Sequence, residues 1–323
     1  MLAGLLFFGC ENEKPSTKVS SNPVEPQLVV PRFDRDSSLE YIKNQIAFGP
    51  RVPNTKEHAA CKEWLVGKFE NLGIRVIQQN FTAKAYTGTV LNGTNIIATF
   101  NPEAKKRILL AAHWDTRPFA DQEPVKKDQD QAVLGADDGA SGVAVLIEIA
   151  RQLQQQPIDV GVDIILFDAE DYGQGGGDGN IKTWCLGSQH WAAKPHQAGY
   201  KARFGILLDM VGAENARFTK EGTSMTYAPN IMNKVWKIAK EKGYSNYFVN
   251  VESRELVDDH LFINQIAGIP TIDIINRPVA SKTGFGEYWH TLHDDMSVID
   301  KRTLRVVGQT VLEVIYRFDA GKF

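Results

Sequence analysis

Carboxylate and imidazole side chains stand directly after several apolar runs of this sequence. Residues 164–167 are Ile-Ile-Leu-Phe, and the acids Asp168, Glu170 and Asp171 follow closely. Further apolar runs reach an acid or an imidazole at residues 107–113, 204–209 and 269–273. An isolated Glu-Asp pair is most simply a solvated turn, but several such runs in one chain predict a shared site.

These residue types suit metal-assisted or acid–base chemistry. Carboxylates and imidazoles, without paired cysteines, are the ligands of catalytic zinc sites, in which three protein ligands leave one position open. A neighbouring glutamate that is not a ligand can act as the general base and acid. The candidate groups, in chain order, are His113, Asp115, Asp138, Glu170, Asp171, Asp209, Asp258 and His290.

Buried strands must position these groups. Consecutive apolar β-formers predict a central parallel strand covered on both faces, and ligands of open α/β sheets bind beyond the carboxyl ends of such strands. Residues 74–81 and 95–100 alternate and predict an antiparallel edge. Apolar residues at spacings of three and four predict helices at 37–47, 57–72, 140–153, 230–240 and 302–317, and shorter helices that end at Ala193 and begin at Asp258.

Two loops and one helix start border the predicted site. The segment 114–136 is too long for a simple connection, so we expect it to be functional or disordered. The glycine-rich segment 173–180 predicts a mobile loop, either a lid or a tolerated insertion. Asp137 and Asp138 precede the helix at 140–153, where one of them is expected to be its N-cap.

The composition describes a globular protein and excludes some partners. The chain has 323 residues, of which 43% are hydrophobic and 23% charged, enough for one large α/β domain or two small ones. The net charge of -3 provides no basic field for nucleic acid. No run of 18 apolar residues occurs, so no membrane-spanning helix is predicted.

Residues 1–30 differ from the rest of the chain. An apolar run at residues 2–9 closes on Cys10, and a polar stretch rich in Ser, Pro, Asn and Lys follows. This resembles the end of a bacterial lipoprotein signal, although no basic residue precedes the run and Phe7 replaces a smaller aliphatic residue. We expect an apolar signal remnant and a flexible tether, and an exported, periplasmic protein with a possible lipid anchor at Cys10. A chance apolar start is the alternative.

The motifs resemble those of the zinc-dependent aminopeptidase superfamily. The resemblance rests on His113-Trp-Asp115, residues 135–142 (Gly-Ala-Asp-Asp-Gly-Ala-Ser-Gly), Glu170-Asp171 and His290. It is closer to one branch, the glutaminyl-peptide cyclotransferases, through residues 207–213, 257–260, 268–270 and 288–291. The resemblance implies a single three-layer domain at residues 31–323, with a mixed, mostly parallel β-sheet and helices on both faces.

The resemblance also implies roles for individual residues. Asp138, Asp171 and His290 would bind one Zn2+ per chain, and Glu170 would be the general base and acid. Asp209 and Asp258 would be paired catalytic carboxylates that share a proton, and Trp289 and Trp184 would bind the substrate, although core packing is the simpler role for Trp184. The expected reaction cyclises the N-terminal glutamine of peptides or proteins to pyroglutamate and releases ammonia. Asp171 replaces a Glu common in the family, and Asp273 replaces a pocket histidine of the animal enzymes.

Two other functions fit the same motifs. His113 and Asp209 match the second-metal ligands of two-zinc aminopeptidases, which remove N-terminal residues, so ligand identity alone does not separate the two enzymes. A catalytically inactive binding domain on the same fold is the third possibility. The two remaining cysteines, Cys61 and Cys185, show no metal-ligand spacing, and the sequence leaves open whether they are buried thiols or a disulfide.

Overall fold

The computed structural model describes residues 1–6, 9, 28–175 and 181–323. Cys10, on which the lipid-anchor prediction rests, and residues 176–180 of the glycine-rich segment lie outside the described residues. Within the described part, no helix combines the length and the apolar character that crossing a bilayer requires.

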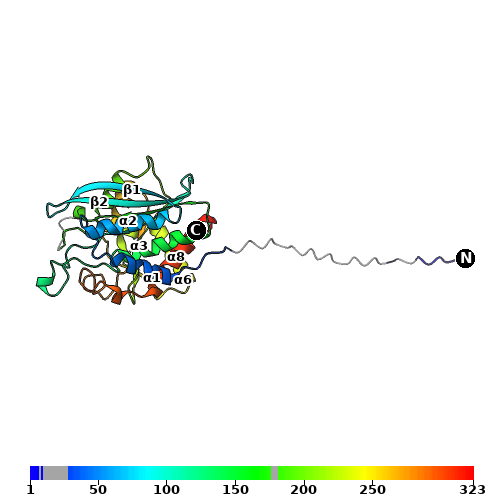
Figure 1. The fold of residues 1–323 in the computed structure, drawn as a ribbon. Coiled ribbons are helices and arrows are strands. Elements are labelled where there is room, and N and C mark those ends of the chain that lie inside the picture. Colours follow the sequence, from blue (N-terminus) through cyan, green and yellow to red (C-terminus); the bar gives the residue numbers. More distant parts are fainter. Residues whose placement is uncertain (7–8, 10–27, 176–180) are drawn as a thin grey trace.

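A six-stranded sheet forms the centre of the molecule, with strands in the order β1-β2-β4-β3-β5-β8 (Figure 1). β1 and β2 form the predicted antiparallel edge, and β2 is also antiparallel to β4. The strands β4, β3, β5 and β8 run parallel to one another, so their carboxyl ends meet at one edge. The strands are β1 (Arg75–Lys84), β2 (Val90–Phe100), β3 (Arg107–His113), β4 (Gly161–Phe167), β5 (Gly205–Asp209) and β8 (Thr271–Ile275).

Helices cover both faces of this sheet, which confirms the predicted three-layer α/β fold class. One layer, seen below β1 and β2 in Figure 1, contains α1 (Arg35–Ile46), α2 (Lys56–Glu70), α3 (Ala140–Gln155), α6 (Pro229–Glu241) and α8 (Lys301–Asp319). The opposite face carries α4 (Leu186–Ala193) and α7 (Asp259–Phe262). Shorter elements are α5 (Gly222–Tyr227), the parallel pair β6 (Phe218–Lys220) and β7 (Phe248–Glu252), a π-helical turn (Ile263–Ala267), and 3-10 turns at Lys126–Asp128, Ile181–Thr183 and Met296–Val298.

Alternation along the strands divides the core into two parts. Ile164 and Leu166 of β4 pack with the larger helical layer, whereas Ile165 and Phe167 pack with Trp191 of α4. All four side chains are fully buried. This two-sided burial is the reason why the central strands are continuous apolar runs rather than alternating ones.

Two local predictions are wrong. The run at 269–273 was expected to end on Asp273, but β8 continues to Ile275, so Asp273 lies in the middle of a buried strand. The N-cap of α3 is Gly139, without a side-chain cap, rather than Asp137 or Asp138. Asp137 instead accepts hydrogen bonds from Gly212 N and the Tyr288 hydroxyl, and these contacts join the start of α3 to two other loops.

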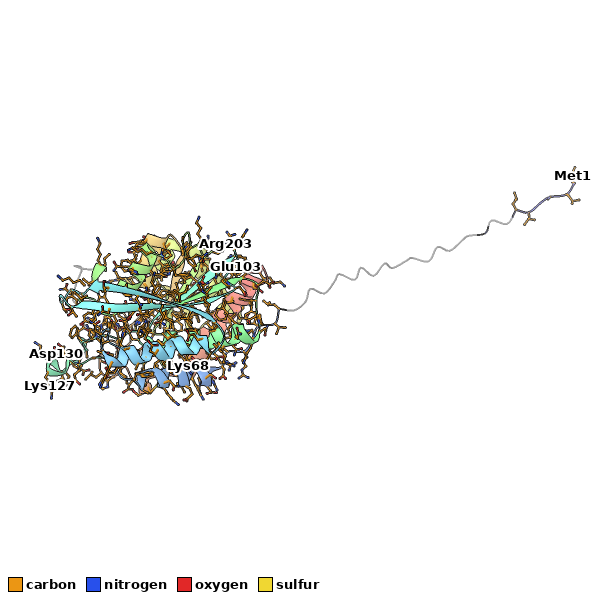
Figure 2. All side chains as sticks on the ribbon, turned by 45° about the horizontal axis from the view of Figure 1, so that its top comes forward. Met1, Lys68, Glu103, Lys127, Asp130 and Arg203 are labelled. Atoms are coloured by element: carbon orange, nitrogen blue, oxygen red, sulfur yellow. The ribbon has the colours of Figure 1, made fainter. Side chains whose placement is uncertain are left out.

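The long loop after β3 is ordered over most of its length. Its tip carries Lys127 and Asp130, which Figure 2 shows on a protrusion from the body of the molecule. Its first residues turn inward, and Arg117 is fully buried. The start of the loop is therefore packed into the protein, whereas its function stays a prediction.

Gly142 lets α3 approach the sheet closely, and we predict that alanine there destabilises the fold. A Cβ on Gly142 would lie 2.3 Å from the Leu208 carbonyl oxygen, whereas one on Gly67 in α2 would meet nothing within 4 Å. Gly142→Ala should lower the free energy of unfolding by about 1–3 kcal/mol, because a packed backbone must move. Gly67→Ala should raise it by up to about 1 kcal/mol. Denaturant titration of both variants measures the difference, and equal midpoints would contradict the packing argument.

Candidate metal centre and active-site cavity

The candidate groups gather at the carboxyl edge of the parallel strands. β3 ends on His113, β5 ends on Asp209, and the turn after β4 carries Glu170 and Asp171. A cavity of about 510 Å³ opens above this edge. Its walls include Asp138, Glu170, Asp171, Trp184, Asp209, Asp258, Arg277, Trp289 and His290. Of the candidate groups, all except His113 and Asp115 thus line one cavity, together with Trp184 and Trp289.

Three of these side chains form a buried cluster suited to a metal ion. One ligand atom from each of Asp138, Asp171 and His290 lies within 4.8 Å of the others. His290 Nε2 is 3.2 Å from Asp171 Oδ1 and 4.0 Å from Asp138 Oδ2. Asp171 Oδ2 is buried and has no hydrogen-bond partner, an arrangement that is costly unless a cation occupies the site. Two carboxylates and one imidazole therefore fit a divalent cation with an open coordination position.

A second set of residues orients His290, and the sequence analysis missed it. Asp121 Oδ1 lies 3.0 Å from His290 Nδ1, which leaves Nε2 directed at the cluster. Arg117 Nη2 donates to Asp121 Oδ2, and its Nη1 donates to the carbonyl oxygens of Asp171 and Gly173. A carboxylate behind a metal-ligating histidine fixes the ring and its tautomer. The only signal in the sequence was the unusual length of the loop that carries Arg117 and Asp121.

Aromatic rings hold His290 from the other directions. The centroid of the Trp289 ring is 3.7 Å from that of His290, and Trp184 is stacked at 6.0 Å. Trp184 is half-buried and lines the cavity, a position that suits the predicted contact with substrate better than the core packing weighed as its alternative. Burial lowers the pKa of His290, but the charge of Asp171 and hydrogen bonds to Asp121 and Asp171 outweigh it and raise the pKa to about 9. The site thus has a negative potential that a bound cation would balance.

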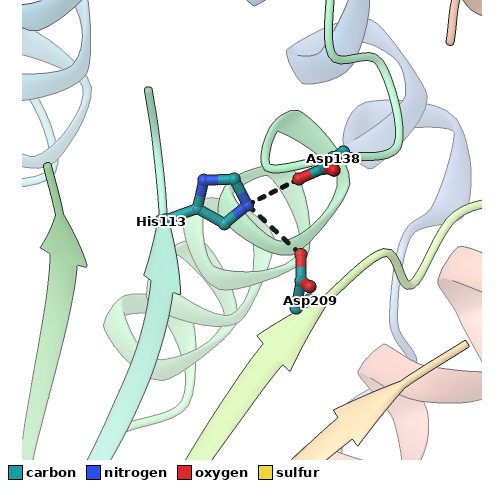
Figure 3. Close-up of side chains that lie close together, drawn as sticks. All are labelled: His113, Asp138 and Asp209. Carbon is teal, nitrogen blue, oxygen red and sulfur yellow. Dashed lines mark hydrogen bonds and ion pairs between the residues drawn. The ribbon is translucent and has the colours of Figure 1, made fainter. Parts of the chain in front are cut away.

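His113 joins the first cluster to a second group of acids (Figure 3). Its Nε2 lies 2.9 Å from Asp138 Oδ1 and 3.2 Å from Asp209 Oδ1. These three residues form another possible ligand group, which shares Asp138 with the first. Burial lowers the pKa of His113, yet hydrogen bonds with Asp115, Asp138 and Asp209 raise it well above its usual value. A protonated His113 would act as a cross-link between two carboxylates, whereas a neutral one could bind a second cation.

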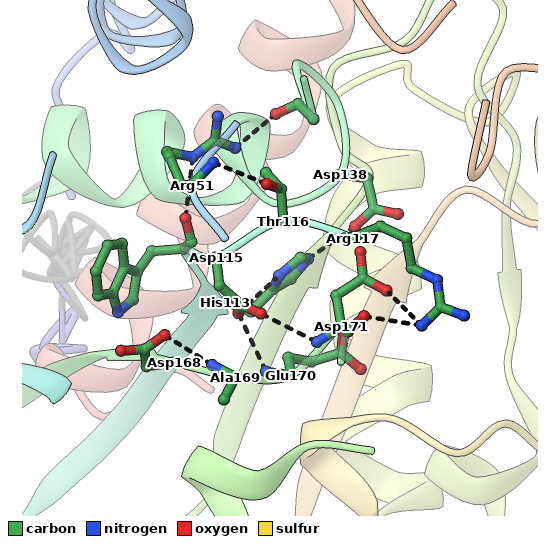
Figure 4. A network of polar contacts seen from close by, with 12 residues as sticks. Arg51, His113, Asp115, Thr116, Arg117, Asp138, Asp168, Ala169, Glu170 and Asp171 are labelled. Atoms are coloured by element: carbon green, nitrogen blue, oxygen red, sulfur yellow. Dashed lines mark hydrogen bonds and ion pairs between the residues drawn. The ribbon is translucent and has the colours of Figure 1, made fainter. Parts of the chain in front are cut away.

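Asp115 shapes the turn that presents the key acids (Figure 4). Its two carboxylate oxygens accept hydrogen bonds from the backbone nitrogens of Glu170 and Asp171. Ala169, at the start of this turn, has a φ of 54°, which directs the next side chains toward the cavity. Asp168 is held away from the site, since His58 and Thr94 N contact its carboxylate. Asp115 is therefore a positioning residue and does not line the cavity.

Glu170 stands beside the metal cluster without belonging to it. The residue is 9% exposed and lines the cavity. Cys185 Sγ donates to Glu170 Oε1 over 3.2 Å, and burial raises the pKa of this thiol so that it stays protonated. Burial raises the pKa of Glu170 well above its usual value, and the charges of Asp171 and Asp258 act in the same direction. Cys61 and Cys185 are both buried free thiols, so they form no disulfide.

Asp258 lies close to a further buried carboxyl group, that of Asp273. One carboxylate oxygen of each lies within 4.8 Å of the other, whereas Asp209 Oδ1 contacts His113 Nε2. Burial and the charges of Asp258 and Asp209 raise the pKa of Asp273 well above its usual value. The sharing of a proton between Asp209 and Asp258 stays a prediction.

Removing the carboxylate that contacts His290 Nδ1 should weaken metal binding, although no metal ligand is removed. We predict that Asp121→Ala lowers the affinity for Zn2+ by about 10–100-fold, as the loss of such hydrogen bonds typically does. The matched control is Asp130→Ala, in the exposed tip of the same loop. Competition with a chromogenic chelator measures both dissociation constants. Equal affinities in the two variants would show that Asp121 does not hold His290.

This fold and this cluster define a metal-binding α/β enzyme, and comparison with known proteins identifies its family. Residues 95–315 match the model of Peptidase family M28, and the chain belongs to this family. The resemblance to the zinc-dependent aminopeptidase superfamily is thereby confirmed.

Several of the relatives and solved structures that resemble the chain are named glutaminyl-peptide cyclotransferases or glutaminyl cyclases. The chain is 29% identical to the glutaminyl-peptide cyclotransferase of Drosophila melanogaster over 88% of its own length and 83% of the relative's. It is 55% identical to the glutaminyl cyclase of Bacteroides thetaiotaomicron crystallised with N-acetylhistamine, with a TM-score of 0.87 and coverage of 89% of this chain and 99% of that chain. A structure from the same species described as a leucine aminopeptidase precursor is also 55% identical, with a TM-score of 0.86 and coverage of 90% and 99%.

Proposed function

We propose that this chain is a glutaminyl-peptide cyclotransferase, which converts the N-terminal glutamine of peptides and proteins to pyroglutamate and releases ammonia. The observation that carries the proposal is the position of Glu170, a buried carboxylate at the cavity wall beside the metal cluster but outside it. Similarity to glutaminyl cyclases of bacteria and animals supports the same assignment.

The cofactor in this proposal is one Zn2+ per chain, held by Asp138, Asp171 and His290. When bound there, zinc polarises the γ-carbonyl group of the substrate glutamine. The cavity of about 510 Å³ accommodates the N-terminal residue, and Trp289 and Trp184 bind its side chain. By filling the space around the carbonyl, these rings exclude water, which would otherwise compete with the amine.

Glu170 moves the proton in this reaction. Its carboxylate accepts a proton from the α-amine as the nitrogen attacks the carbonyl carbon of the side-chain amide, and it returns this proton to the departing amide nitrogen. A new carbon–nitrogen bond closes the ring while the old one breaks, and ammonia leaves. The raised pKa of Glu170 favours the second transfer, because a weaker acid holds the proton until the leaving group needs it. Asp258 maintains that pKa through its charge, and Asp209 holds His113.

A two-zinc aminopeptidase is the second candidate, and one observation favours it. His113, Asp138 and Asp209 form a further ligand group that shares Asp138 with the first. Metal content separates the two functions, because the cyclotransferase binds one zinc per chain and the aminopeptidase binds two. A content of two zinc ions with cleavage of an Ala-initiated peptide would overturn the proposal.

The proposed activity is tested directly with two dipeptides. Purified protein should release ammonia from a Gln-initiated dipeptide and should leave an Ala-initiated dipeptide intact. An inactive binding domain would release no ammonia and would leave both dipeptides unchanged, although every candidate acid, base and ligand is present in this chain. Mass spectrometry should show that the product of the Gln-dipeptide is lighter than the dipeptide by about 17 Da, the mass of ammonia. This difference is the one expected for ring closure without hydrolysis.

We also propose that the protein is exported to the periplasm and anchored by lipid at Cys10. The apolar run before Cys10 and the polar stretch after it support this proposal. The wild-type protein should then be recovered in the membrane fraction, whereas Cys10→Ala should release it into the soluble fraction. Recovery of both forms in the soluble fraction would refute the anchor.

A further inference from the structure

A second cavity adjoins the catalytic one. Its volume is about 400 Å³, and it lies between the end of β7 and the loop that follows β8. Arg277 and Thr283 line both cavities. A peptide whose first residue occupies the catalytic cavity can therefore continue past Arg277 into the second one.

Arg277 is a partly buried cation without a carboxylate partner. Its side-chain nitrogens form no hydrogen bond and no ion pair with any residue that the structure describes, and Nε is buried. The guanidinium lies over the Phe285 ring, 4.6 Å from its centroid. A buried donor that lacks a partner is costly. The aromatic contact leaves the hydrogen-bonding edge of the group available to a ligand.

The charges around the second cavity favour an anion. Arg254 and Lys282 line it together with Arg277, and Glu252 is the one acid among its lining residues. Arg254 and Lys282 are exposed, and within the described chain neither side chain forms an ion pair. The catalytic cavity is lined instead by several carboxylates. The two cavities therefore differ in the sign of their charge.

We propose that the second cavity binds a carboxylate of the substrate, located one or two residues after the N-terminal glutamine, with Arg277 as its main donor. This inference rests on the proposed cyclotransferase function and specifies its preferred substrates. The carboxylate comes from an aspartate or glutamate side chain or from the C-terminus of a short peptide. A planar guanidinium can donate two parallel hydrogen bonds to such a group.

The subsite lies away from the reacting atoms, so it should act on binding more than on the chemical step. We expect kcat/KM for a Gln-peptide with a suitable carboxylate to exceed that of its neutral isostere by about tenfold, in the range of hydrogen bonds between charged groups. The difference should appear mainly in KM. It should shrink at high salt, since part of the attraction is screened.

The test compares amidated tripeptides that begin with glutamine and carry Glu or Gln at position two or three, and one dipeptide as free acid and as amide. The tripeptides report a side-chain carboxylate, and the dipeptide pair reports the C-terminal one. Cyclisation of the neutral peptides by the wild-type enzyme establishes the underlying function independently. If these peptides are turned over and no acidic form is preferred, the subsite proposal is overturned while the function stands.

Variants of the cationic residues test which side chain causes the preference for acidic peptides. Arg277→Gln should reduce the ratio of acidic to neutral kcat/KM to about one, Arg277→Lys should retain part of the ratio, and the exposed pair Arg254→Gln and Lys282→Gln should lower it partly. The matched control is Arg203→Gln, an exposed arginine before β5 and labelled in Figure 2, which should keep the wild-type ratio. A wild-type ratio in Arg277→Gln, or an equal loss on acidic and neutral peptides, would overturn the assignment of Arg277.

Discussion

Replacing Glu170 by glutamine should lower kcat by about 10²–10⁴ while the protein keeps its zinc, because general acid–base catalysis contributes that much and an amide cannot carry the proton. The side chain is nearly isosteric, and Glu170 is absent from the cluster of Asp138, Asp171 and His290. Cys185 can still donate to the amide oxygen, so the side chain at position 170 should keep its place in the cavity wall. Steady-state rates on a Gln-dipeptide and zinc content by elemental analysis measure the two effects.

The matched control is Glu214→Gln, which makes the same chemical change on an exposed side chain in the loop after β5. This variant should retain wild-type kcat and zinc. Loss of zinc from Glu170→Gln would instead mean that Glu170 is a ligand. Unchanged kcat with zinc retained would remove Glu170 from the proton path.

The strands and most of the site were predictable from local patterns. His113 and Asp209 are the last residues of buried strands, and the turn with Glu170 and Asp171 directly follows another. Parallel strands must place their carboxyl ends at one edge, so the pattern of each run was enough to predict that these groups meet. The predicted extents of the longer helices agree with the structure to within a few residues for the same reason, since apolar periodicity is a local property.

The supporting contacts were not predictable, because they join distant parts of the chain. Asp121 reaches His290 across 169 positions of sequence, and Arg117 is buried by residues from several loops. Nothing in the neighbourhood of Cys185 indicates that its thiol contacts Glu170. Asp273 was misplaced because an acid in an apolar run normally marks the end of a strand. Here Asp273 is buried within β8, and burial together with the charges of Asp258 and Asp209 raises its pKa well above the usual value, which favours the neutral acid.

The fold also explains why one of two adjacent aspartates is a candidate ligand and the other is not. Asp294 accepts hydrogen bonds from the backbone nitrogens of both Asp137 and Asp138. The side chain of Asp137 accepts hydrogen bonds from Gly212 N and the Tyr288 hydroxyl. The side chain of Asp138 instead points to His113 and His290. Tyr288 and His290 belong to one segment, so Asp137 also fixes the approach of the third ligand.

Replacing His290 by alanine should have the opposite signature to Glu170→Gln, since zinc should be lost together with activity. Two carboxylates would remain, Asp138 and Asp171, and both are buried. We expect the affinity for zinc to fall by at least about 100-fold, more than for the loss of a supporting hydrogen bond. Zinc content after dialysis against a weak chelator measures retention directly.

Thermal unfolding with and without added zinc gives an independent readout of the same site. A ligand that binds only the folded state raises the apparent stability by RT ln(1 + [L]/Kd), so zinc should raise the Tm of the wild type but not of His290→Ala at the same concentration.

The matched control is His293→Ala, three positions away and exposed, which should keep both the metal and the shift in Tm. Full zinc retention by His290→Ala would remove His290 from the metal centre, and loss of zinc from both variants would indicate damage to the segment rather than loss of a ligand. Zinc loss in His290→Ala alone is the outcome expected if the imidazole of His290 is the third metal ligand. Asp121, Trp289 and Trp184 hold this imidazole in place.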